Sequence, residues 1–181
     1  LRSDYWLLRG LVNHPPGDLS SSPWRAVKLS RKPQHPAASE LADYLSFAAE
    51  TGHLVFATLH TNSAAQSIDR MIDVFPPHQQ PQIRAQLANI LMAIVSQRLI
   101  PTIGGGRVAS AEILVATPAV RNIIREGKSH QLDAVIQTGD DQGMQSMDKT
   151  LVGLVQAGTV TFEEARNYAV DLGEFDRMMR G

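Results

Sequence analysis

Residues 52–64 read GHLVFATLHTNSA, and this stretch decides the fold that we expect. Residues 54–59 are apolar except for Thr58 and show no polar alternation, which is typical of a strand buried on both faces of a parallel sheet. Ser63 follows a polar turn and precedes an Ala-rich run with helical periodicity, where its hydroxyl can cap the first N–H groups of a helix. The stretch therefore predicts a strand, a turn and a helix in an α/β fold.

The polar turn between this strand and this helix is the first candidate site. Ligands of open α/β sheets bind outside the carboxyl ends of the strands, and a helix N-terminus favours anions. His60 and Thr61 stand at this place, so we expect them to face a phosphate, with a hydrogen-bonded structural histidine as the open alternative. A metal pair of His53 and His60 is not expected, because seven residues of strand separate them by about 23 Å on opposite faces.

Composition describes an ordinary globular chain. Its 181 residues are 43% hydrophobic and 19% charged, which fits one domain of common size. The absence of cysteine from the sequence excludes disulfides and thiolate metal sites. The sequence has no run of 18 apolar residues and no signal-peptide pattern, so we expect a cytoplasmic protein without direct membrane insertion.

The first segment differs from the rest in charge and composition. Residues 1–36 hold six Lys or Arg against Asp4 and Asp18, which gives +4 and leaves −5 for the remainder. Both tryptophans and five of the ten prolines also lie there. Basic residues among aromatics occur at nucleic-acid interfaces, but scattered charges in a proline-broken segment favour a poorly ordered arm. We therefore expect residues 1–38 to be such an arm, with no nucleic-acid partner.

Regular periodicity begins at Ser39 and continues through the remaining elements. The pattern predicts helices at residues 39–51, 64–74, 79–97, 118–126, 129–137, 144–157 and 162–170. Strands at residues 99–103 and 108–116 flank Gly104-Gly105-Gly106, which indicates a hairpin rather than a phosphate-binding loop. We expect a core region at 39–116, a helical domain at 117–173 and a tail at 174–181.

No complete catalytic motif occurs in the sequence. A phosphate loop needs Gly-x-x-x-x-Gly-Lys-Ser/Thr after a strand. The nearest match, Gly127-Lys128-Ser129, has Asn122 in place of the first glycine, and Gly127 closes a predicted helix. There is also no apolar strand ending in Asp-Glu that would hold Mg²⁺, no Gly-x-Ser-x-Gly elbow and no zinc-spaced cluster. The sequence therefore predicts no complete catalytic site and no metal site.

Several stretches between residues 40 and 171 resemble one protein family. Residues 48–64, AAETGHLVFATLHTNSA, resemble the His box of the type IV pilus retraction ATPases, the PilT-type twitching-motility motors of the type II/IV secretion ATPase superfamily. Residues 117–126, TPAVRNIIRE, are similar to the Ala-Ile-Arg-Asn-Leu-Ile-Arg-Glu segment of these motors. Further matching stretches are Ile68-Asp69-Arg70, Asp73-Val74-Phe75-Pro76, Ser96-Gln97-Arg98-Leu99, Ile103-Gly104-Gly105-Gly106-Arg107-Val108, Ile136-Gln137-Thr138-Gly139 and Gly143-Met144-Gln145.

This resemblance implies a fold and a set of site residues. The fold is a partial RecA-like (P-loop NTPase) core that lacks its phosphate-loop half, followed by a small helical C-terminal domain. The nucleotide-sensing His-box residues carried over are His53, Thr58, His60 and Thr61. The retraction-associated helix carried over consists of Val120, Arg121, Asn122, Ile123, Ile124, Arg125 and Glu126.

The resemblance also implies cofactors, partners and a location. Intact family members use ATP and Mg²⁺, and we expect neither to bind tightly to this chain alone. The implied partners are like chains in a hexameric ring or full-length motor subunits, and a platform protein of the pilus machine in the inner membrane. The implied location is cytoplasmic, with a peripheral position at the inner membrane left open.

The departures from the family pattern define two functional expectations. The family places a phosphate loop and a Walker B strand before the His box, whereas here Arg9-Gly10 stands where Gly-Glu would supply the catalytic acid. We therefore expect part of a hexameric ATP-driven motor for type IV pilus retraction that is inactive alone. The alternative is a non-catalytic oligomerisation or partner-binding module of a pilus or type II secretion assembly.

Overall fold

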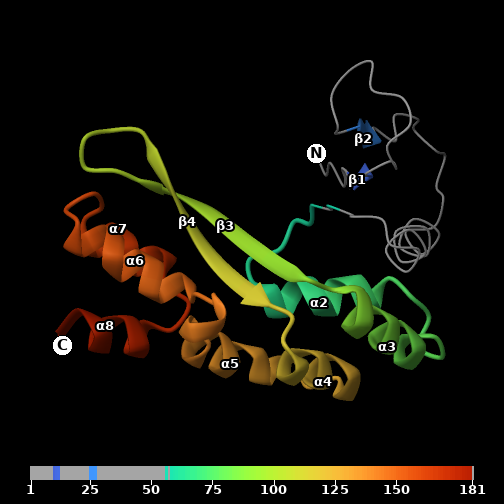
Figure 1. Ribbon diagram of the computed structural model, residues 1–181. Coiled ribbons are helices and arrows are strands. Elements are labelled where there is room, and N and C mark those ends of the chain that lie inside the picture. Colours follow the sequence, from blue (N-terminus) through green and yellow to red (C-terminus); the bar gives the residue numbers. More distant parts are fainter. Residues whose placement is uncertain (1–9, 13–24, 28–55, 57, 181) are drawn as a thin grey trace.

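The computed structural model describes residues 10–12, 25–27, 56 and 58–180 of the chain (Figure 1). Two short strands, β1 (Gly10–Val12) and β2 (Arg25–Val27), form an antiparallel pair. The predicted helix at residues 39–51 and His53 lie outside the described residues, as does most of the predicted arm at residues 1–38. These expectations stay predictions.

A long antiparallel hairpin forms the axis of the described fold (Figure 1). Strand β3 (Ala93–Pro101) pairs with β4 (Arg107–Val115) in continuous register, from Ala93 opposite Val115 to Pro101 opposite Arg107. Gly105 and Gly106 in the turn have φ of 83° and 86°, a left-handed conformation that glycine adopts without strain. The predicted glycine hairpin is therefore confirmed, with a first strand that begins earlier than expected.

The early start of β3 corrects the helix predicted at residues 79–97. Helix α3 (Gln80–Ile90) ends at its C-cap Leu91, and the chain is already extended at Ala93. The apolar spacing of Ile83, Leu87, Ile90 and Ile94 continues the helical period across this boundary and misled the prediction. Backbone hydrogen bonding to the whole of β4 favours the extended form more than the apolar spacing favours a helix. The β-branched residues Ile94 and Val95 also suit a strand.

Most predicted helices are present, and their caps are those that the sequence indicates. Ser63 accepts a hydrogen bond from the N–H of Gln66, and Thr117 accepts one from Val120. Thr161 accepts one from Glu164, and Gly127 closes its helix with φ of 68°. The helical elements besides α3 are α2 (Ala64–Asp73), α4 (Pro118–Glu126), the 3₁₀ turns η1 (Ser129–Gln131) and η2 (Asp140–Gln142), α5 (Leu132–Thr138), α6 (Met147–Gln156), α7 (Phe162–Tyr168) and α8 (Leu172–Arg180).

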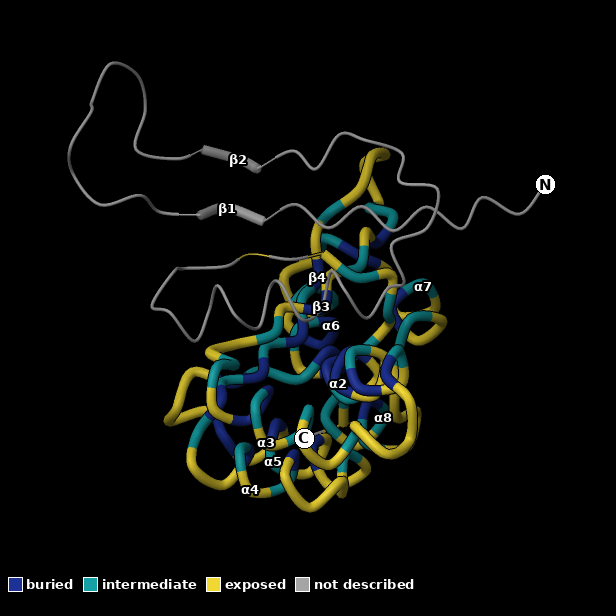
Figure 2. The backbone as a smooth tube through the Cα atoms, turned by 90° about the vertical axis from the view of Figure 1, so that its right-hand side faces the viewer, coloured by how far each residue is buried: buried dark blue, intermediate teal, exposed yellow. Residues whose placement is uncertain are grey.

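The helices pack against the inner face of the hairpin in two hydrophobic clusters. Figure 2 marks in dark blue the buried residues along the backbone. The first cluster joins Leu114 of β4 to buried residues of α2, α3, α4 and α5. The second cluster joins Ile100 of β3 to Met147 and Leu151 of α6 and to Phe175 of α8. The hairpin therefore spans both clusters and connects them.

Helix α8 corrects the tail predicted at residues 174–181. Phe175 is fully buried, and its ring centroid lies 5.6 Å from that of Phe162 on α7. Phe175 is the one residue of α8 that is classed as buried, so the helix offers little apolar repetition from which the sequence could predict it. Residues 172–180 thus belong to the helical region rather than to a tail.

The strand predicted at residues 54–59 is not seen where the structure describes this stretch. Phe56, Thr58 and Leu59 have no regular secondary structure, and the Phe56 side chain is 49% exposed. A strand buried on both faces needs neighbouring strands. The described residues form only the β1–β2 and β3–β4 pairs, and neither pair includes this stretch. Within the described part of the chain, no helix is both long and apolar enough to span a bilayer.

Candidate functional site

The turn before α2 places the described sensing candidates, Thr58, His60 and Thr61, ahead of the N-terminus of a capped helix. The side chain of His60 is exposed, and Thr58 is exposed beside it. The hydroxyl of Thr61 lies 2.6 Å from that of Ser67, which joins the turn to the first turns of α2. The N–H of Asn62 donates to the side chain of Gln66 over 3.2 Å. Two hydrogen bonds therefore fix the turn to α2, and the imidazole of His60 is left exposed.

Glu112 fixes the first N–H group of α2 from the facing strand. Its Oε1 accepts a hydrogen bond of 2.7 Å from the N–H of Ala64. The Glu112 side chain lies on the inner face of β4 and is only 4% exposed. A carboxylate at a helix N-terminus satisfies a free donor and interacts favourably with the helix dipole. Glu112 thus anchors the helix that begins directly after the turn.

Burial dominates the protonation of this carboxyl. It raises the pKa of Glu112 above its ordinary value of 4.5, while the N–H of Ala64 opposes the shift. The charges of Asp133 and Asp148 raise this pKa further, whereas the charge of Arg98 lowers it. Burial also raises the pKa of the neighbouring Asp133. The inner face of β4 therefore carries an acid that holds its proton more tightly than an exposed glutamate.

Arg98 reaches the same turn from the inner face of β3. Its Nη2 donates to the carbonyl of Asn62 over 3.4 Å, and its Nη1 donates to the carbonyl of Tyr168 over 2.9 Å. Tyr168 is the last residue of α7. One guanidinium thus contacts the turn before α2 and the end of a helix from the C-terminal region.

Gln145 joins the segment before α6 to the edge of β4. Its backbone N–H and C=O exchange hydrogen bonds with Ile113 over 3.0 and 2.8 Å. Its side-chain amide donates to the carbonyl of Ala111 over 2.9 Å and to the hydroxyl of Thr150 over 2.7 Å. The family-like stretch Gly143-Met144-Gln145 therefore extends the sheet by one bridge, and Met144 is buried beside it.

The apolar residues of the predicted retraction-associated helix lie in the first hydrophobic cluster. Helix α4 buries Val120 and Ile124, and Ile123 packs against the same cluster. Ile68 and Ile72 of α2 belong to that cluster as well. Helix α4 therefore shares apolar packing with α2, the helix that follows the turn of His60 and Thr61.

The polar residues of α4 contact α3 rather than the turn. Arg121 donates to the carbonyls of Ala88 and Asn89 at the end of α3, the latter over 2.7 Å, and to Ala116 over 3.0 Å. Arg125 donates to the side chain of Asn89 over 2.8 Å. The two arginines thus bind the end of α3, where cations are favoured.

The remaining charged and polar residues of α4 face solvent. Asn122 donates to Glu126 over 2.8 Å, and Lys128 pairs with Glu126 over 2.8 Å. These contacts from Lys128 and Asn122 lower the pKa of the exposed Glu126. The exposed side of α4 therefore carries Asn122 and Glu126 on a helix fixed by its other face.

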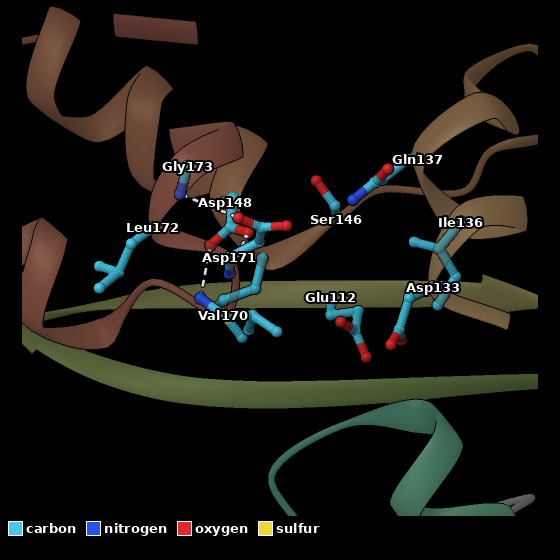
Figure 3. A pocket seen from close by; sticks show the side chains of 11 residues that line it. Glu112, Asp133, Ile136, Gln137, Ser146, Asp148, Val170, Asp171, Leu172 and Gly173 are labelled. Carbon is cyan, nitrogen blue, oxygen red and sulfur yellow. Dashed lines mark hydrogen bonds between the residues drawn. The ribbon is translucent and has the colours of Figure 1, made fainter. Parts of the chain in front are cut away.

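A cavity of about 480 Å³ opens between β4 and the C-terminal helices (Figure 3). In Figure 3 the Glu112 and Asp133 side chains lie next to each other, and Asp148 and Asp171 belong to another part of the lining. Asp148 accepts hydrogen bonds from the N–H groups of Val170 and Asp171 over 2.7 and 2.9 Å. Asp171 in turn accepts one of 2.9 Å from the N–H of Gly173 at the start of α8.

The acidic lining argues against a nucleotide in this cavity. Four carboxyl groups surround it, and like charges at short range repel a triphosphate. His60 and Thr61 are not among its lining residues. In the part of the chain that the structure describes, no three His, Asp or Glu side chains are grouped so that they could hold a metal ion. A phosphate partner of the turn would therefore approach from outside this cavity.

Sequence reasoning missed the supports of the turn. Glu112 and Arg98 are charged residues at inward positions of strands, which is the signal that could have identified them. The position of Arg98 was hidden because residues 91–97 were predicted as the end of a helix. Asp148 gives no such signal, because its partners are backbone N–H groups 22 and 23 residues away.

Comparison with known proteins identifies the group to which the chain is related. Residues 38–105 match the model of the Type II/IV secretion system protein family. The chain is 54% identical over 122 residues to the "Type IV pilus retractation ATPase PilT" of Pseudomonas aeruginosa, covering 67% of this chain and 36% of that protein. It is also 54% identical over 123 residues to a "Twitching motility protein" of Neisseria gonorrhoeae, covering 33% of that protein. The chain thus spans about a third of the length of these relatives.

A solved structure shows the same relationship at the level of the fold. The pilus retraction motor PilT with bound ADP superposes with a TM-score of 0.68 and 44% identity, over 80% of this chain and 40% of that one. The α/β architecture and the helices that follow it are therefore those of a known ATPase group. Over two thirds of its length the chain is thus similar to PilT-type proteins, and residues 38–105 match the type II/IV secretion system protein family.

Proposed function

We propose that this chain is the nucleotide-sensing and ring-forming part of a motor subunit for type IV pilus retraction. The relationship to PilT over two thirds of the chain is the observation that carries this proposal. The exposed His60 beside the capped N-terminus of α2 supports a sensing role, because an imidazole at such a place can approach a phosphate.

The sensing residues of the proposal are His53, Thr58, His60 and Thr61. In this reading ATP and Mg²⁺ are held by a phosphate loop and an acidic strand that these 181 residues do not contain. Partners are then like subunits in a hexameric ring and a platform protein at the inner membrane. The helix of Val120 to Glu126 contributes the retraction-associated surface through Asn122 and Glu126.

The chain alone should not hydrolyse ATP. Phosphoryl transfer depends on positioned Mg²⁺ and a positioned water, and neither has a complete set of ligands in this sequence. Phosphate release from ATP and Mg²⁺ with the purified chain should match the rate without protein. Turnover above that rate that disappears in His60→Ala would contradict the proposal.

A second candidate is a non-catalytic assembly module that binds motor subunits without affecting nucleotide turnover. The exposed apolar side chains of Val95 and Leu99 on the outer face of β3 favour this alternative, because such surfaces mark interaction sites. Adding the chain to a full-length PilT-type motor distinguishes the two. If the chain senses nucleotide within the ring, a saturating concentration of the chain should change the ATPase rate of the motor. If it is an assembly module, it should co-sediment with the motor and leave the ATPase rate unchanged.

A further inference from the structure

The inner face of the hairpin changes from apolar to polar between the two hydrophobic clusters. On β3, Ile94 packs against the first cluster and Ile100 lies in the second, with Ser96 and Arg98 between them. On β4, Leu114 and Val108 hold the corresponding positions, with Ser110 and Glu112 between them. Ser96, Arg98, Ser110 and Glu112 share one face, because Ser96 is paired with Glu112 and Arg98 with Ser110. We refer to these four residues as the polar seam.

The polar seam is where distant parts of the chain are joined. Arg98 binds the carbonyl of Asn62, 36 residues away, and the carbonyl of Tyr168, 70 residues away. Glu112 binds the N–H of Ala64, two residues after Asn62. The turn before α2 is thus held on its carbonyl side by Arg98 and on its N–H side by Glu112.

Stability alone does not account for the polar seam. The Nε of Arg98 and the Oγ of Ser96 are buried without a hydrogen-bond partner among the described residues. Buried polar atoms that lack partners cost free energy, and apolar residues of similar volume often replace buried charges without loss. The two unpartnered atoms of Ser96 and Arg98 therefore call for an explanation other than stability.

We propose that Arg98 is a positioning residue that ties the turn of residues 60–62 to the end of α7, so that displacement of the turn reaches the C-terminal helices. A planar guanidinium holds its N–H donors at fixed geometry, and here the Nη1 and Nη2 groups each bind a different segment. From Tyr168 the connection continues through Val170 and Asp171, whose N–H groups bind Asp148 of α6. The biological meaning of this tie depends on the proposed sensing role of His60, but the tie itself requires no nucleotide.

Amide hydrogen exchange in the complete chain tests the tie without nucleotide. The N–H groups of Ala64 and Val170 report the two ends, and that of Ile124 in α4 reports overall stability. In Arg98→Met, exchange at Ala64 and Val170 should accelerate about tenfold relative to Ile124. Arg107→Gln is the matched control, because Arg107 is exposed at the far end of β4 and should leave all three rates unchanged.

Arg98→Lys keeps the positive charge but removes the paired hydrogen bonds of the guanidinium. It is also the variant to use if Arg98→Met does not fold. Lysine keeps a positive charge near Glu112, so the pKa of the Glu112 carboxyl, followed by ¹³C NMR, should stay close to that of the parent chain. A single ammonium lacks the two-pronged geometry, so exchange should still accelerate at Ala64 or Val170. Full protection at both amides in Arg98→Lys would overturn the proposal, as would equal acceleration at Ile124 in Arg98→Met.

A double-mutant cycle tests whether the two ends communicate through Arg98. Asp148→Asn weakens the hydrogen bonds that Asp148 accepts from the N–H groups of Val170 and Asp171. In a chain that keeps Arg98, this change should accelerate amide exchange at Ala64 at least about threefold. With Arg98→Met in the same chain, the added Asp148→Asn change should have no further effect at Ala64. An equal effect in both backgrounds would contradict the tie. If the exchange results are as expected but the chain does not change the ATPase rate of a full-length motor, only the proposed sensing role is refuted and the tie through Arg98 stands.

Discussion

At the scale of single residues, Glu112 shows how a buried carboxyl can anchor a helix at a cost. Its Oε1 satisfies the first N–H of α2, which an exposed cap would do as well. Burial nevertheless raises its pKa, so the folded state disfavours the ionised form. The unfolded chain ionises this group at a lower pH than the folded chain does. As the pH rises from the unfolded pKa to the higher folded pKa of Glu112, the free energy of unfolding falls, and it stays at this lower value at higher pH.

Glu112→Gln should stabilise the chain at neutral pH. The amide oxygen keeps the acceptor for the N–H of Ala64, and the buried charge is removed. The midpoint of thermal unfolding should be higher in the variant at pH 7, and the difference should shrink as the pH falls toward the ordinary pKa of 4.5. A variant that is less stable than the parent at pH 7 would show that interaction of the charge with α2 outweighs its burial.

The residue scale is also where sequence reasoning stops for the candidate site. His60 and Thr61 were predictable, because a polar turn before a capped helix is a local pattern. Their supports were not, because Arg98 and Glu112 reach the turn from positions 36 and 48 residues away in sequence. Spacing within one segment contains no information on such contacts. Charged residues at inward strand positions were the available signal.

At the scale of elements, Arg121 joins α4 to the end of α3. Its guanidinium binds the carbonyls of Ala88, Asn89 and Ala116. The carbonyls at a helix end have no partner within the helix and carry the negative end of its dipole. The element pair α3 and α4 therefore depends on one half-buried cation as well as on apolar packing.

Arg121→Met should cost about 2 kcal/mol of unfolding free energy, since hydrogen bonds to charged groups contribute about 1.5–3 kcal/mol. Arg125→Met is the matched control on the same helix, because its single exposed contact to Asn89 should contribute less than about 1 kcal/mol. Urea denaturation of both variants measures the difference. Equal effects of the two substitutions would contradict the role given to Arg121.

Helix α8 provides the second prediction at this scale. Phe175→Ala removes a fully buried ring and should cost about 3–5 kcal/mol, as large-to-small core substitutions do. Leu172→Ala in the same helix removes a side chain that is 47% exposed and should cost less than about 1 kcal/mol. Chemical denaturation monitored by circular dichroism compares the two. A small effect of Phe175→Ala would indicate that residues 172–180 contribute little to the fold.

Elements with local end signals were predictable, and elements defined by long-range pairing were not. Ser63, Thr117, Gly127 and Thr161 each marked a helix end that the structure contains. The first residues of β3 were assigned to a helix, because their extended form depends on pairing with β4. The strand expected at residues 54–59 failed at its described positions for the same reason, since burial on both faces requires partner strands.

At the scale of the whole molecule, the hairpin separates a covered face from an open one. The inner face carries both clusters and the polar seam, while Val95 is 62% exposed and Leu99 is 49% exposed on the outer face. Exposed apolar side chains on a strand favour association with another surface. The architecture therefore predicts that the isolated chain associates with itself through the outer face of the hairpin.

The double variant Val95→Thr, Leu99→Lys should reduce this self-association. Thermal stability should change little, because neither side chain contributes to the two clusters. Light scattering as a function of concentration should show a smaller average mass than for the parent chain. If the double variant scatters as much as the parent chain and is equally stable, the chain associates through a surface other than the outer face of the hairpin.

The central claim for the whole molecule is that His60 reports nucleotide within a ring of motor subunits. The direct measurement is the ATPase rate of a full-length PilT-type motor with increasing amounts of the parent chain, His60→Ala or His78→Ala. His78 is exposed between α2 and α3 and serves as the matched histidine. We predict that the parent chain and His78→Ala change the rate equally and that His60→Ala does not change it. The same effect from all three chains would contradict the claim.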